Sequence, residues 1–100
     1  MNKSWTVAVD DDCWLVTRIV RLPGEFRFSV MYILDTGKKW IEPVRIDNYP
    51  HFGEKKTHIH RKGDSRVEFR EMSLKEAEET AQRIGKNIRE RIKNGSHTDY

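Results

Sequence analysis

The chain has 100 residues, of which 36% are hydrophobic and 35% are charged, and this length suits a single folded domain. No stretch approaches the roughly 20 apolar residues that a membrane span needs, and the N-terminus lacks the apolar run of a secretory signal, so we expect a soluble, cytoplasmic protein without a membrane partner. A single cysteine, Cys13, excludes an intramolecular disulfide and the cysteine-rich zinc motifs, which leaves histidine and carboxylate as the metal ligands to consider.

The net positive charge of the chain lies in its second half. Residues 1–50 contain seven Lys or Arg against seven Asp or Glu, whereas residues 51–100 contain twelve against nine, which accounts for the net charge of +3. Residues 55–70 are strongly cationic, with six basic side chains against two acidic ones. This segment favours a polyanionic partner, because binding to phosphates releases condensed counterions, although a solvated basic surface has the same composition.

The first half of the chain predicts strands joined by short turns, because β-branched and aromatic residues are concentrated in segments that turn-forming residues separate. In the last of these segments every second residue from Trp40 to Ile46 is expected on one face, and Pro43 predicts an edge strand or a bulge because proline donates no ladder hydrogen bond. The aromatic side chains, three tryptophans among them, are expected in the core rather than on the surface as stacking platforms for RNA. The predicted strands cover residues 5–9, 14–22, 26–34 and 40–46, with turns at 10–12, 23–25 and 35–39.

The segment after the fourth strand predicts a loop and two short strands. Residues 48–56 contain turn formers and show no periodicity. Short strands are expected over residues 57–60 and 66–70, with a turn at Lys62-Gly63-Asp64 between them. Most of the basic residues of the cationic segment fall on this loop and hairpin.

A single long helix is predicted after residue 73. Ser73 and Glu76 form the S-x-x-E pattern of a capping box, and Asn94-Gly95 ends the helix. Strands followed by a terminal helix predict an α+β fold, in which an antiparallel sheet of about five to six strands has the helix packed on one face. Residues 1–95 would form this single domain and 96–100 a flexible tail. The apolar stripe of the helix consists of Leu74, Ala77, Ala81, Ile84, Ile88 and Ile92.

Three of the four histidines, His51, His58 and His60, lie within ten residues of one another. His58 and His60, two residues apart, project to the same face if their segment is extended. Asp47 lies four residues before His51, and the loop between them and His58 could bring all four side chains together. This cluster is the main candidate for a functional site.

Three interpretations of the cluster remain open from the residues alone. Two histidines can act as general base and general acid in RNA cleavage, with Lys55, Lys56 and Arg61 stabilising the charge on the phosphate. His51, His58 and His60 could instead bind zinc or another divalent metal, an interpretation that the H-x-H spacing supports only moderately. In the third interpretation they are structural histidines in a basic loop.

The residues Arg45-Ile46-Asp47-Asn48-Tyr49-Pro50-His51, followed by His58-Ile59-His60, resemble the TumE family of prokaryotic toxin–antitoxin proteins. That family is marked by Asp-Asn-x-Pro-His-His, a short spacer and Pro-His-His-Lys-His, and the resemblance covers about Val20 to Lys62. This chain has Phe52 in place of the second histidine of the first motif, and Lys56-Thr57 in place of the Pro-His before the final His-x-His. The positions that match are Asp47, Asn48, Pro50, His51, His58 and His60.

The resemblance implies a toxin component of a toxin–antitoxin pair, and we expect it to act on RNA and to have a cognate antitoxin protein. As a candidate ribonuclease without a required cofactor it would use His51 and one of His58 or His60 as the acid–base pair, with Asp47 orienting a histidine. The alternatives are a non-catalytic module that binds nucleic acid or protein through the same loop, and a metal-dependent phosphodiesterase. The residues expected to bind nucleic acid are Lys55, Lys56, Arg61 and Lys62.

Overall fold

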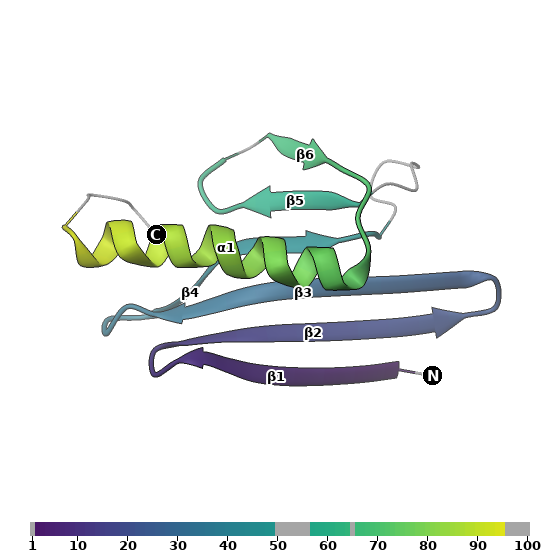
Figure 1. Ribbon diagram of the computed structural model, residues 1–100, viewed down its shortest axis with the longest axis horizontal. Coiled ribbons are helices and arrows are strands. Elements are labelled where there is room, and N and C mark those ends of the chain that lie inside the picture. Colours follow the sequence, from purple (N-terminus) through teal and green to yellow (C-terminus); the bar gives the residue numbers. More distant parts are fainter. Residues whose placement is uncertain (1, 50–56, 65, 96–100) are drawn as a thin grey trace.

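The computed structural model describes residues 2–49, 57–64 and 66–95, in which six strands precede one helix (Figure 1). The predicted α+β class, with an antiparallel sheet and a C-terminal helix, is therefore confirmed. The predicted tail at 96–100 and most of the predicted loop lie outside the described residues. The elements are β1 (Asn2–Asp10), β2 (Cys13–Leu22), β3 (Glu25–Asp35), β4 (Trp40–Asp47), β5 (His58–Arg61), β6 (Val67–Phe69) and α1 (Leu74–Lys93).

The six strands form one sheet in chain order, and every neighbouring pair is antiparallel. Tight turns make this order possible. Gly24, between β2 and β3, has a φ of 73°, and Gly37, between β3 and β4, has a φ of 88°, a region in which a residue with a Cβ atom is strained. Strands that are consecutive in sequence are therefore neighbours in the sheet, so β4 and β5 lie side by side.

Helix α1 lies across one face of the sheet, over β2, β3 and β4 (Figure 1). The predicted capping box is present: the Ser73 hydroxyl accepts the Glu76 N–H at 3.2 Å, and the Glu76 carboxylate accepts the Ser73 N–H at 3.1 Å. The helix buries Ala77, Ala81, Ile84 and Ile88 of the predicted stripe. No helix in the described part of the chain is both long and apolar enough to cross a membrane.

The hydrophobic core lies between the helix and the sheet. The central side chains facing the helix, Val30, Tyr32, Val44, Ile46 and Ile59, have no solvent exposure. Because successive residues of a strand point to opposite faces, the alternate positions of the same strands point away from α1. We call this opposite side of the sheet the distal face.

A bulge in β4 changes which of its residues face the core. Ile33 of β3 lies opposite two residues of β4, Glu42 and Pro43, where the register shifts. The expected alternation along the strand is therefore wrong at its start: Ile41 is 5% exposed and Trp40 is 68% exposed. Because β4 is an interior strand, the bulge, and not an edge position, accommodates the missing N–H of Pro43.

The three tryptophans are not core residues, contrary to the expectation from their alternation. Trp14 and Trp40 stack on each other with ring centroids 5.2 Å apart, at distal-face positions of β2 and β4. Trp5 is 36% exposed on the outermost strand, β1, where its indole N–H donates to Glu78 at 3.2 Å. The reason is that α1 covers only one face of the strands β2 to β4. Trp14 and Trp40 lie on the opposite face of these strands, and Trp5 lies on the outermost strand.

Candidate functional site

The site lies on the distal face, where β4 and β5 pair. Asp47 is directly opposite His58, and Arg45 is directly opposite His60. The two histidines therefore share a face, as their spacing predicts, and their ring centroids are 5.9 Å apart. The pairing of β4 with β5 therefore places a carboxylate and an arginine from one strand next to two imidazoles from the other, although residues 48–57 separate the two strands in sequence.

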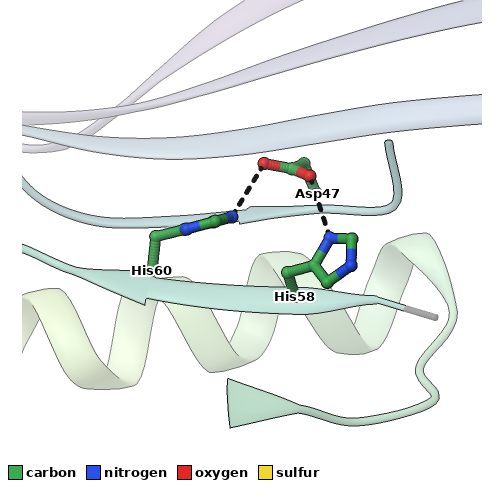
Figure 2. A group of neighbouring side chains, drawn as sticks. All are labelled: Asp47, His58 and His60. Atoms are coloured by element: carbon green, nitrogen blue, oxygen red, sulfur yellow. Dashed lines mark hydrogen bonds and ion pairs between the residues drawn. The ribbon is translucent and has the colours of Figure 1, made fainter. Parts of the chain in front are cut away.

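The carboxylate of Asp47 lies between the two histidine rings (Figure 2). One oxygen is 3.4 Å from His58 Nδ1, and the other is 3.4 Å from His60 Nε2. The Tyr49 backbone N–H donates to the first oxygen at 3.2 Å, and Arg45 Nε lies 3.4 Å from the second. Asp47 is only 1% exposed, so these groups together replace the water that an ionised carboxylate requires.

His58 is buried and cannot touch a substrate in this arrangement. Its exposed fraction is 0%, and the ring of Phe69 in β6 packs edge-on against it at 5.1 Å. His58 therefore holds Asp47 from one side, which makes it a positioning residue for the cluster.

Of the two histidines of the cluster that the structure describes, His60 is the one that reaches the surface. Its side chain is 25% exposed, and it lines a hollow of about 300 Å³ together with Glu42, Arg45, Arg61 and Lys62. With Nε2 directed at Asp47, the other ring nitrogen, Nδ1, is the atom that can accept or deliver a proton. An imidazole oriented by a carboxylate beside three cationic side chains has the groups needed for proton transfer at a phosphate.

Glu42 and Arg45 also line this hollow, and neither is among the site residues predicted from the sequence. The position of Arg45 was predictable, since it lies two residues before Asp47 and so shares its face in a strand. The position of Glu42 was not predictable, because the bulge at Pro43 decides the direction of its side chain. Burial raises the pKa of the Glu42 carboxyl group, an effect that the nearby Arg45 opposes.

The raised pKa of Glu42 predicts a stability difference that depends on pH. The folded state holds this proton more tightly than the unfolded state does, so ionisation of Glu42 lowers stability as pH rises through the window between the two pKa values. Glu42→Gln is therefore expected to raise the free energy of unfolding at neutral pH and to leave it unchanged below about pH 3, where glutamate is protonated in both states. Urea titrations at neutral pH and at the acidic pH measure this difference, with Glu71→Gln as the surface control. An equal gain in the free energy of unfolding at both pH values would contradict the prediction.

Asn48, the second residue of the Asp-Asn pair, has a structural role. Its side-chain oxygen accepts the Phe28 N–H at 2.7 Å, and its amide donates to the Phe26 carbonyl at 2.9 Å. These bonds fasten the end of β4 to β3 beyond the last paired residues, Ser29 and Asp47. Asn48 thereby fixes the backbone position from which Asp47 projects.

Asp47, His58 and His60 also have a geometry that suits a divalent metal. One ligand atom from each lies within 4.8 Å of the others. The two separations of 3.4 Å involve different oxygens of the Asp47 carboxylate. Imidazole nitrogens and a carboxylate oxygen are ligand types that zinc binds, so these side chains fit the donor set of a metal site.

The remaining candidate residues divide into two groups. His51, Lys55 and Lys56 lie outside the described residues. Arg61 pairs with Glu68 at 3.2 Å, and Lys62 is exposed at the turn after β5. Both Arg61 and Lys62 line the hollow beside His60.

Comparison with known proteins adds no relative. No family model, no curated protein and no solved structure matches the chain. The resemblance to the TumE family therefore stays a prediction.

Proposed function

We propose that the protein acts on RNA and cleaves it by histidine acid–base catalysis, with His60 as the histidine that contacts the substrate. One observation carries the proposal: the buried carboxylate of Asp47 lies 3.4 Å from Nε2 of His60, while the partly exposed ring lines a hollow with three cationic side chains. This is the arrangement in which a carboxylate sets the tautomer and orientation of a general base.

The chemistry follows from the positions of the groups. His60 Nδ1 takes the proton of a ribose 2′-OH, the 2′ oxygen attacks the adjacent phosphorus, and the bond from phosphorus to the 5′ oxygen breaks. Arg45, Arg61 and Lys62 stabilise the negative charge that builds on the phosphoryl oxygens. The products are a 2′,3′-cyclic phosphate and a 5′-hydroxyl.

The leaving 5′ oxygen needs a proton donor. His51 is the donor that the sequence motif suggests. Among the described residues the candidate is Glu42, which lines the same hollow and whose raised pKa favours the protonated form. Comparing Glu42→Gln with His51→Ala in one cleavage assay distinguishes the two donors.

His60→Ala tests the proposal directly. We expect it to lower the rate of cleavage of single-stranded RNA by roughly 10² or more, with an unchanged circular dichroism spectrum. The wild-type protein should leave the corresponding DNA intact, because DNA lacks the 2′-OH that the reaction consumes. Lys75→Ala, which removes an exposed cation at the start of α1, should keep the wild-type rate.

Intact RNA after prolonged incubation with folded wild-type protein would contradict the proposal that the protein is a ribonuclease. If that protein still bound RNA with an affinity that falls as the salt concentration rises, the non-catalytic binding module would become the preferred function. The Asp-Asn and His-x-His residues that resemble the TumE family support a toxin role with a cognate antitoxin. A neighbouring reading frame for a small DNA-binding protein would strengthen that role.

A metal-dependent phosphodiesterase is the second candidate, favoured by the grouping of one ligand atom each from Asp47, His58 and His60 within 4.8 Å. Here Asp47, His58 and His60 would hold the metal, which supplies Lewis-acid activation of the phosphate. The same cleavage assay separates the candidates: a chelator should abolish the activity of a metal enzyme and leave acid–base cleavage unchanged. Elemental analysis of the purified protein, with His58→Ala plus His60→Ala as the control, gives a second measurement.

A further inference from the structure

A second and larger hollow lies on the other side of the β5–β6 turn from the histidine cluster. It measures about 580 Å³ and lies between that turn and the second half of α1. We call it the cationic cleft. Ile84 and Ile88, both nearly buried, belong to its lining, so part of its wall is continuous with the packed core.

Five basic side chains line the cationic cleft against one acidic side chain, Asp64. Asp64 is already paired with Arg66 at 3.2 Å. Over the described part of the chain, no carboxylate forms an ion pair with Lys62, Arg83 or Arg91. Three positive charges therefore face the cleft without neutralisation by a described residue. The five basic residues are Arg61, Lys62, Arg66, Arg83 and Arg91.

Both walls of the cleft are held in place by the fold. The Lys62 N–H donates to the Pro43 carbonyl at 3.0 Å, which ties the turn to β4 at its bulge. Gly63 has a φ of 81°, and the Asp64 N–H closes the turn on the Arg61 carbonyl at 3.1 Å. The helix wall is fixed by the burial of Ile84 and Ile88. The backbone positions that carry the cations are thus fixed before a ligand arrives, which lowers the entropic cost of binding.

The cationic cleft adjoins the hollow beside His60, because Arg61 and Lys62 line both. A single strand that passes over these two side chains would contact both hollows. The volume falls in the range of small-ligand sites, about 300–1,000 Å³, which admits a phosphate with part of its nucleotide. Guanidinium groups bind phosphate oxygens in pairs and stack on unpaired bases.

We propose that the cationic cleft binds backbone phosphates of single-stranded RNA next to the phosphate that reaches His60. The choice of RNA rests on the proposed function. The binding site itself rests on the charge of the cleft and on its position beside the hollow of His60. Arg83 and Arg91, which lie far from the basic segment in sequence, are assigned to RNA binding by this geometry.

The experiment measures binding of a labelled single-stranded uridine oligoribonucleotide by fluorescence anisotropy over a series of salt concentrations. The host is the full chain carrying His60→Ala, so that the RNA stays intact. Adding Arg83→Ala plus Arg91→Ala is expected to weaken binding about tenfold and to make the slope of log affinity against log salt less negative by about 1.4, two single-strand phosphate contacts. The control, Lys75→Ala plus Lys86→Ala, removes equal charge from exposed positions of α1 outside the cleft.

Each outcome decides the proposal. Weaker binding and a less negative salt slope in the cleft variant, with neither change in the control, support the proposal. This holds even if wild-type protein fails to cleave RNA, a result that would contradict only the proposed enzymatic function. Equal losses in both variants, or none in the cleft variant, overturn the proposal. Tighter binding of polyglutamate than of RNA, lost in the same cleft variant, also overturns it and identifies an acidic protein segment as the ligand.

Discussion

Asp47→Ala is expected to lower the free energy of unfolding by about 3 kcal/mol or more, because it removes the buried carboxylate that Arg45 and the two imidazoles contact. His58, with no solvent exposure, would lose the carboxylate 3.4 Å from its Nδ1. The same variant should lose RNA cleavage at least as completely as His60→Ala, since Nε2 of His60 would lose the group that orients it. Urea denaturation measures the first effect, and a cleavage assay below the unfolding range measures the second.

Two further variants separate this explanation from a general loss of packing. Ser29→Ala changes the buried residue directly opposite Asp47 on β3 and should cost about 1 kcal/mol or less. Adding His58→Leu to Asp47→Ala should make the double variant more stable than the sum of the two single effects predicts, because both polar partners are then absent. Strict additivity would show that Asp47 and His58 do not stabilise each other.

Gly85→Ala is expected to be the most damaging single substitution in α1. A methyl group at this position would overlap the ring of Tyr32, which has no solvent exposure. Alanine favours the helix over glycine by about 1 kcal/mol, but overpacking of a rigid core site opposes this by more. We expect a net loss of about 3 kcal/mol, and a melting temperature lower by roughly 12–20 °C.

Thermal denaturation followed by circular dichroism at the helix wavelength measures this effect. Gln82→Ala, an exposed position of the same helix, provides the comparison and should leave the melting temperature nearly unchanged. A melting temperature for Gly85→Ala equal to or above that of the wild type would show that the helix can shift away from β3. The close packing of α1 on Tyr32 would then not be a constraint on the fold.

The elements of this fold were largely readable from the sequence because their signals are local. The Ser73 and Glu76 capping box and the apolar stripe specify the helix within its own length. Glycine and proline turns separate the strands. The two-residue spacing of His58 and His60 places both on one face of β5. Each of these features depends on neighbours a few residues away.

The composition of the site depended on contacts between distant residues. Asp47 meets His58 because the register of β4 and β5 sets them opposite each other, and no periodicity in residues 48–56 fixes that register. The Phe69 ring on β6 makes His58 a buried positioning residue rather than a surface one. Glu42 enters the hollow of His60 through the bulge at Pro43.

The cationic cleft shows the same division between local and long-range information. The sequence by itself showed a basic segment at residues 55–70 and a helix with basic residues in its second half. Only the packing of α1 beside the β5–β6 turn places Arg83 and Arg91 across from Lys62. Helices and strands can be predicted from the sequence because the interactions that specify them join residues a few positions apart. The site depends on the strand register and on the docking of the helix, and both are set by the burial of side chains that are distant in sequence.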